Sequence, residues 1–125
     1  MILYHFTSDK YLTYILQYGI RRGDVPTSPF EGFNAPWLTN NPSWKSQGWS
    51  RGGLDKTAVR LTVHIQDRDT KLKYWPALAK ELQVEDFWYK ALDATGSNGS
   101  NNWFVYLGVI PVTSIEVEFR DNTSS

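Results

Sequence analysis

The segment from Ala58 to Ile65, AVRLTVHI, carries the pattern that most restricts how this chain can fold. Apolar residues at Val59, Leu61 and Val63 alternate with Arg60, Thr62 and His64, and a period of two residues is typical of a β-strand with one buried face. The apolar face has to meet a core, and the polar face should meet solvent or a cleft. The remaining question is which elements supply that core.

Other parts of the sequence favour further strands and a few short helices. Strands are expected at Ile2–Phe6, Pro36–Thr39, Trp103–Ile110 and Ser114–Phe119, a helix at Asp9–Tyr18, and two helices between Lys73 and Asp93. Thr7, Ser8 or Asp9 can cap the first helix, and Gly19 is a typical residue at which such a helix ends. Core-facing stripes are expected in the helical pair at Trp75, Leu78, Ala79 and Leu82, and at Phe87, Trp88, Ala91 and Leu92.

The segments between these elements read as loops. Residues 21–36 hold three prolines and two glycines without a period, so we expect a long loop of functional interest. Residues 40–49 indicate a turn followed by one or two helical turns, and residues 94–102 a small polar loop.

Helices grouped between strands, without regular alternation, favour an α+β domain over a doubly wound parallel sheet. At 125 residues the chain has the size of one domain, which we place at residues 1–120, followed by a polar tail at 121–125.

Composition excludes several classes of function. Thirteen basic and thirteen acidic residues cancel, so no overall positive field attracts nucleic acid. There is no cysteine, and two histidines are too few for most metal sites, so no metal is expected. No apolar segment approaches the ~20 residues needed to cross a bilayer, and the first ten residues lack signal-peptide features. We therefore expect a cytoplasmic protein without a membrane partner.

Tryptophan is concentrated in one short stretch. Three of the six tryptophans, Trp37, Trp44 and Trp49, lie in APWLTNNPSWKSQGW, which also contains two prolines and a glycine. They either fasten a loop to the core or form an aromatic surface for a ligand, and Trp44 fits the first role better.

His5 is the other candidate for chemistry. It lies two residues before Thr7 on the first strand, so both side chains point to the same face. The sequence leaves open whether His5 is a core histidine bonded to backbone or part of a site. His64 is most simply a half-exposed surface residue. Dinucleotide fingerprints, Walker loops, zinc helices and nucleophile elbows are all absent from the sequence.

Two motifs resemble the ADP-ribosyltransferase superfamily. LYHFTSDKYLTYILQYGI resembles its opening strand with His-x-Thr leading into a helix, and GFNAPWLTNNPSWKSQGW resembles its second signature of two aromatics around a serine-containing helix start. The resemblance covers residues 3–49 and is closest to DarT-type toxins and RNA 2'-phosphotransferases, with the PARP-like NAD-binding fold. It implies an α+β domain in which two small sheets form a central cleft, surrounded by short helices.

The resemblance also implies a site that takes NAD as substrate. The residues implied to bind NAD are His5, Thr7, Arg21, Trp37, Thr39, Ser46 and Trp49. Trp37 and Trp49 would sandwich the nicotinamide, a flat cation that aromatic faces attract. Arg21 and Arg22, or Lys45 and Arg51 on the other rim, would meet phosphate.

The sequence departs from the family pattern at the third signature. Many members carry a glutamate at the head of a late strand, where this chain has Asn102 or Trp103, which with His5 form the implied catalytic set. Asparagine cannot supply a negative charge beside a developing cation. Glu31, Glu116 and Glu118 are poor substitutes, since the last two should point outward.

Three functions therefore remain open. The chain is expected to transfer ADP-ribose from NAD to a protein or nucleic-acid acceptor, as a stand-alone toxin or phage effector. The alternatives are an NAD-dependent RNA 2'-phosphotransferase and a noncatalytic nucleotide-binding or inhibitor module on the same fold. The neutral charge counts somewhat against the phosphotransferase.

Overall fold

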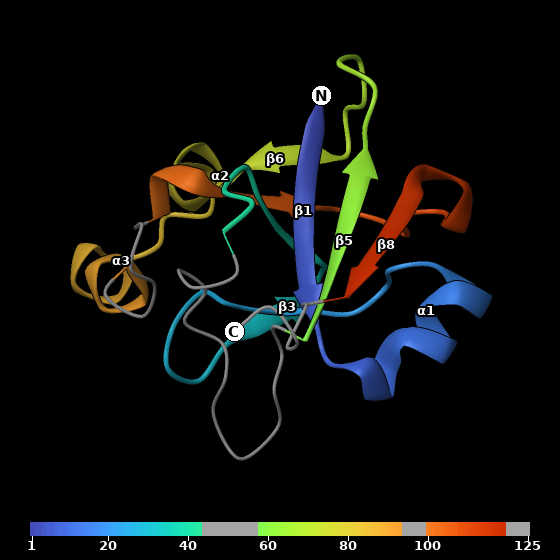
Figure 1. The fold of residues 1–125 in the computed structure, drawn as a ribbon. Coiled ribbons are helices and arrows are strands. Elements are labelled where there is room, and N and C mark those ends of the chain that lie inside the picture. The colour runs from blue at the N-terminus through green and yellow to red at the C-terminus, as the bar shows by residue number, and fades with distance from the viewer. Residues whose placement is uncertain (44–57, 94–99, 120–125) are drawn as a thin grey trace.

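The structure, a computed structural model, describes residues 1–43, 58–93 and 100–119. An antiparallel six-stranded sheet in the order β6-β7-β4-β1-β5-β8 dominates the fold (Figure 1). Its strands are β1 (Ile2–Thr7), β4 (Trp37–Thr39), β5 (Val59–His64), β6 (Leu72–Tyr74), β7 (Trp103–Tyr106) and β8 (Ile115–Phe119). A second sheet is the hairpin of β2 (Asp24–Pro26) and β3 (Gly32–Asn34). The helices are α1 (Leu12–Tyr18), α2 (Trp75–Glu81) and α3 (Asp86–Asp93), with 3-10 turns at Asp9–Tyr11, Ser100–Asn102 and Val112–Ser114.

This architecture confirms the predicted single α+β domain. The alternating segment around Leu61 is confirmed as β5, which pairs with β1 on one side and β8 on the other. Among the described residues there is no helix long and apolar enough to span a membrane.

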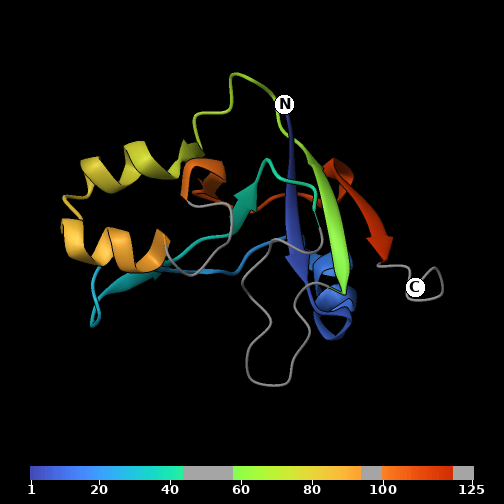
Figure 2. The same cartoon turned by 60° about the vertical axis from the view of Figure 1, so that its left-hand side comes forward.

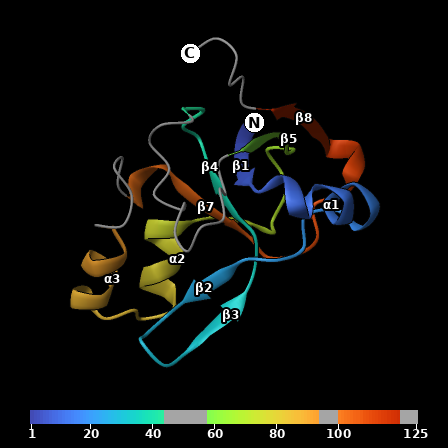
Figure 3. The same cartoon turned by 60° about the horizontal axis from the view of Figure 1, so that its bottom comes forward.

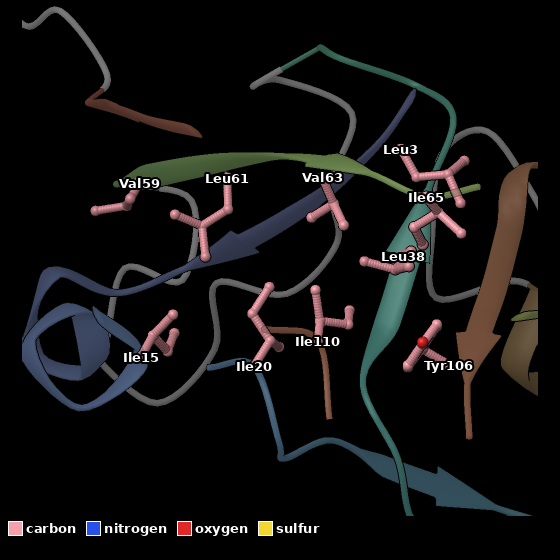
Figure 4. Close-up of a cluster of buried hydrophobic side chains, with 10 residues drawn as sticks. All are labelled: Leu3, Ile15, Ile20, Leu38, Val59, Leu61, Val63, Ile65, Tyr106 and Ile110. Carbon is pink, nitrogen blue, oxygen red and sulfur yellow. The ribbon is translucent and has the colours of Figure 1, made fainter. Parts of the chain in front are cut away.

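The large sheet buries apolar side chains on both faces. Leu3 faces Val63 and His5 faces Leu61 in the β1–β5 register, so these residues share one face, which α1 covers. The core on this face consists of Leu3, Ile15, Ile20, Leu38, Val59, Leu61, Val63, Ile65, Tyr106 and Ile110 (Figure 4). The core on the other face consists of Val25, Ala35, Trp75, Leu78, Ala79, Trp103 and Val105. Figure 3 shows α1 and the α2–α3 pair on opposite sides of the molecule.

The turn from β1 into α1 forms as the sequence predicts. Ser8 is the cap, and its Oγ accepts a hydrogen bond from the Lys10 amide at 3.2 Å. The helix ends at Gly19, whose φ of 83° lies in the region that favours glycine. Gly19 also lies close to the backbone of Ile110, since a Cβ on Gly19 would come within 2.3 Å of the Ile110 carbonyl oxygen.

The prediction of a continuous loop over residues 21–36 is wrong, because this segment contains the β2–β3 hairpin. Val25 pairs with Phe33, and Val25 is fully buried in the second core. Pro26 is compatible with its place in β2, because each strand of a two-stranded sheet has a free edge, where a missing N–H is not needed.

Three core-facing predictions are also wrong, and one of them concerns Ala91 of α3, which is exposed. Leu82 ends α2 with 42% of its surface exposed, and Phe87 of α3 is 62% exposed. Both helices are short and lie at the edge of the domain, so only part of each apolar stripe meets the sheet. The short strand β6 before α2 was not predicted, and the helical turns expected over residues 40–49 fall largely outside the described residues.

Candidate functional site

The large sheet opens between β1 and β4. β1 pairs along its full length with β5, whereas within the described residues its pairing with β4 is limited to Tyr4 and Thr39. We call this opening the fork. The His5 ring bridges it, because Nδ1 lies 2.8 Å from the carbonyl oxygen of Trp37. The His5 side chain thus links β1 to β4 where no further backbone pairing between the two strands is described.

A pocket of about 840 Å³ lies at the fork. Its described lining comes from β1, the 3-10 turn and helix α1, the segment that leads into β2, the last residue of β3, β4 and the first residue of β7. The residues are Tyr4, His5, Phe6, Thr7, Tyr11, Tyr14, Ile15, Gly19, Ile20, Arg21, Arg22, Gly23, Asp24, Asn34, Trp37, Leu38, Thr39 and Trp103. A pocket of this size accommodates a ligand larger than a single amino acid or sugar.

His5 is held neutral at the wall of this pocket. Burial lowers the pKa of His5 below its usual value of 6.5, and the hydrogen bond to the Trp37 carbonyl offsets this only in part. A carbonyl can only accept, so Nδ1 carries the proton and Nε2 is left with its lone pair. His5 therefore presents a hydrogen-bond acceptor suited to a ligand hydroxyl. His5 is thus bonded to backbone, as in the first interpretation left open by the sequence, and it also lines a pocket.

Thr7 and Thr39 also line this pocket, so their hydroxyl groups are candidates for contact with a ligand. Both side chains are almost fully buried, and Thr39 Oγ1 accepts a hydrogen bond from the Asn41 amide at 3.1 Å. Each hydroxyl can donate to a ligand oxygen at little cost in mobility, because the strands hold the side chains in place.

Trp37 belongs at once to the pocket and to the second core. Its ring makes edge-to-face contacts with Trp75 at 5.0 Å and with Trp103 at 5.6 Å between centroids. Its Nε1 donates to the Asp24 carbonyl at 2.7 Å. The orientation of the ring is therefore fixed, and its partly exposed surface faces the pocket. Trp37 therefore fastens its segment to the core, and it also lines the pocket.

The mouth of the pocket is formed by residues 21–24, which Asn34 holds in place. Asn34 Nδ2 donates to the Arg21 carbonyl at 2.9 Å, and its Oδ1 accepts from the Gly23 amide at 3.1 Å. A Cβ on Gly23 would lie 2.1 Å from the Ala35 carbonyl oxygen, so only glycine allows this close approach. Both Arg21 and Arg22 line the pocket, which gives it two cations at its mouth.

Aromatic side chains of the first helix complete the wall, and the sequence did not single them out. Tyr11 and Tyr14 lie three residues apart and outside the apolar stripe of α1, so the helical pattern alone predicts that they face solvent. In the structure both line the pocket. The Arg22 guanidinium lies over the Tyr14 ring, 5.3 Å from its centroid. Asp24 and Asn34 were missed because the segment was treated as one loop.

The remaining predicted residues do not all meet here. Trp103 is almost fully buried at the edge of the pocket, whereas Asn102 is not among the lining residues and its carbonyl accepts from the Asn40 amide at 3.1 Å. Ser46 and Trp49, with Lys45 and Arg51, lie outside the described residues. Glu31 lies in the hairpin turn and is not a lining residue.

The two late glutamates are exposed, as expected, and neither lines the pocket. Glu116 pairs with His64 at 3.0 Å, and Glu118 pairs with Arg60. The register puts Arg60 opposite Phe6, on the face opposite to that of His5. His64 is half-exposed, as the sequence predicts.

In the part of the chain that the structure describes, there is no group of three or more histidine, aspartate or glutamate side chains arranged to hold a metal ion. No protein-family model matches the sequence, and comparisons with curated proteins and with solved structures also find no match.

Proposed function

We propose that this chain binds NAD in the pocket at the fork and transfers its ADP-ribose group to a protein or nucleic-acid acceptor. One observation carries the proposal: the His5–Thr7 pair of β1, Arg21 and Trp37, three sites well separated in the sequence, line a single pocket of about 840 Å³. The resemblance implies that all four residues bind NAD, with Arg21 at the phosphates and Trp37 at the nicotinamide.

Each of these lining residues has a chemistry that suits one part of NAD. Neutral His5 accepts a hydrogen bond from a ribose hydroxyl through Nε2, and Thr7 donates to a neighbouring oxygen. Arg21 and Arg22 at the mouth neutralise the diphosphate, for which planar guanidinium groups are suited. The fixed ring of Trp37 offers an aromatic face to the nicotinamide cation, an interaction of about 0.5–2 kcal/mol.

The reaction exchanges one bond for another at the nicotinamide ribose. The glycosidic bond to nicotinamide breaks and its electron pair leaves with the nicotinamide, while an acceptor oxygen or nitrogen bonds to the same carbon and releases its proton. Positive charge develops on the sugar, so a carboxylate nearby lowers the barrier. Asp24 is the single carboxylate among the described lining residues, and we assign it this role in place of Asn102.

A noncatalytic nucleotide-binding module is the second candidate. It is favoured by Asn102, which stands where a glutamate is expected and does not line the pocket. The two candidates differ in one measurable respect, which is whether bound NAD is cleaved.

The test measures NAD binding by isothermal titration calorimetry and nicotinamide release by chromatography, with the same protein sample. His5→Gln is compared with the control His64→Gln, since His64 lies on the other face and pairs with Glu116. Arg21→Gln is compared with Arg68→Gln, an exposed arginine away from the pocket. Binding should weaken about tenfold or more in the His5 and Arg21 variants and stay unchanged in both controls.

Asp24→Asn separates the two candidates. For a transferase, this variant still binds NAD but releases nicotinamide about a hundredfold more slowly, because it loses a charge that matters mainly in the transition state. If the original protein binds NAD and releases no nicotinamide with any acceptor supplied, the noncatalytic module is correct. Absence of NAD binding would refute both.

A further inference from the structure

The tip of the β2–β3 hairpin displays an apolar side chain that the fold does not use. Phe30 is 95% exposed, the highest value among the large apolar residues that the structure describes. A fully exposed phenylalanine contributes no burial to the stability of the domain, and single exposed apolar residues on flexible loops are common. The hairpin tip is different because its backbone is ordered.

Four hydrogen bonds fix the turn around Phe30. Ser28 Oγ accepts from the amides of Phe30 at 3.2 Å and Glu31 at 3.0 Å. The Glu31 carbonyl in turn accepts from the amides of Thr27 at 2.9 Å and Ser28 at 3.2 Å. Phe30 is therefore presented in a set position, and docking it costs less ordering entropy than docking a flexible loop.

The hairpin is also tied firmly to the domain. The indole N–H of Trp37 donates to Asp24, and that of Trp88 donates to the Pro26 carbonyl at 3.1 Å. The second bond joins the hairpin to α3, and the two lie side by side in Figures 2 and 3. Phe87, next to Trp88 in α3, is 62% exposed. We call Phe30 and Glu31 the hairpin surface.

Among the described residues, the charges that neighbour Phe30 and Phe87 in the sequence are acidic except for Lys90. Residues 23–43 contain no lysine or arginine, whereas Glu31 follows Phe30 directly and Glu85 and Asp86 precede Phe87. Lys90 is the nearest cation along α3, and it pairs with Asp86 at 3.0 Å. Nucleic acid and anionic membranes are repelled by such a surface. A protein that offers an apolar cavity with a basic rim is attracted to it.

We infer that the hairpin surface docks a protein partner, with Phe30 as the anchor that enters an apolar cavity and Glu31 as the contact to a lysine or arginine at its rim. A central aromatic anchor beside a charged contact is the usual arrangement of a binding hot spot. The surface lies outside the pocket at the fork, so this function does not depend on NAD.

The test immobilises the full chain and selects binders from a phage-displayed library of folded peptides with a randomised concave face, because the proposed partner offers a cavity. Enriched peptides should combine apolar residues with lysine or arginine. Their affinity should fall about tenfold or more for Phe30→Ala and about threefold, more at low salt, for Glu31→Gln. Phe119→Ala is the matched control, because Phe119 is also 60% exposed but lies on β8. Circular dichroism verifies that each variant is folded.

Other outcomes would overturn the inference. Peptides that bind Phe30→Ala as well as the original chain, or a selection that enriches none, would remove the anchor role. Loss of single-stranded DNA or anionic-vesicle binding on Phe30→Ala would assign the surface to a different partner. Concentration-dependent dimers in analytical ultracentrifugation that Phe30→Ala abolishes would assign it to a second copy of the chain.

Discussion

At the scale of single residues, Gly19 and His5 each combine two roles. Gly19 ends α1 with a positive φ and also touches the Ile110 carbonyl, to which the neighbouring Ile20 amide is bonded at 2.9 Å. His5 closes the fork with one ring nitrogen and offers the other to the pocket. Substitutions at these two positions should therefore change the stability of the protein for different reasons.

Gly19→Ala should destabilise the protein by about 1–3 kcal/mol, because alanine is strained at this φ and its Cβ collides with backbone that cannot turn aside. Gly108→Ala is the control. A Cβ there would meet the end of the flexible Lys71 side chain at 3.0 Å, so the change in unfolding free energy should stay within about 0.5 kcal/mol. Urea unfolding measures both, and equal effects would contradict the role given to Gly19.

Stability should depend on pH through His5. Its pKa is lowered in the folded state by burial, so below pH 6.5 the unfolded chain binds more protons than the folded one. The free energy of unfolding therefore falls as the pH falls below 6.5, by up to about 1.4 kcal/mol per pH unit. Urea unfolding at about pH 7.5 and 5.5 should show a smaller decrease for His5→Gln than for the original chain. A decrease that persists in His5→Gln and vanishes in His64→Gln would contradict this account.

At the scale of elements, a strand or helix was predictable wherever its own sequence shows the apolar face that packs on the core. β5, with Val59, Leu61 and Val63 buried, and α1 with its Gly19 end are examples. The β2–β3 hairpin was not predictable, because its two strands have three residues each and are too short to show a period. Tertiary contacts decide such segments: Val25 is buried by residues that are distant in the sequence.

The same limit applies to the candidate site. His5 and Thr7 share a strand, so their common face followed from alternation alone. Asp24 and Tyr14 reach the pocket only because the hairpin and α1 both pack next to the fork, and no local pattern encodes that placement. Asn102 was assigned from a resemblance, and its side-chain position depends on a 3-10 turn that the sequence did not indicate.

The Asn34 amide should matter for the whole mouth of the pocket. Asn34→Ala removes both bonds to residues 21–23, so Arg21 and Arg22 lose their fixed position and NAD affinity should fall about threefold to tenfold. Asn41→Ala is a suitable comparison because Asn41 does not line the pocket. Calorimetry with both variants tests this, and equal losses would argue against a specific role for Asn34.

At the scale of the whole molecule, protection should be uneven across the sheet. β1 and β5 have partners on both sides, whereas β6 and β8 are edge strands and β8 is largely exposed. Amide hydrogen exchange followed by mass spectrometry should therefore be slowest in β1 and β5 and faster in β6 and β8. Slower exchange in β8 than in β5 would show that this order of stability is incorrect.

The position of β1 between β4 and β5 also has a consequence for the folding pathway. β1 pairs with a strand that lies more than fifty residues later, since Thr7 faces Val59 and Ile2 faces His64. Contacts between such distant segments raise the contact order, and loop closure has to precede any gain from them. During synthesis, β1 has no partner for its longer ladder until β5 has left the ribosome. The apolar strand that carries His5 thus stays without its main partner while more than fifty further residues are synthesised.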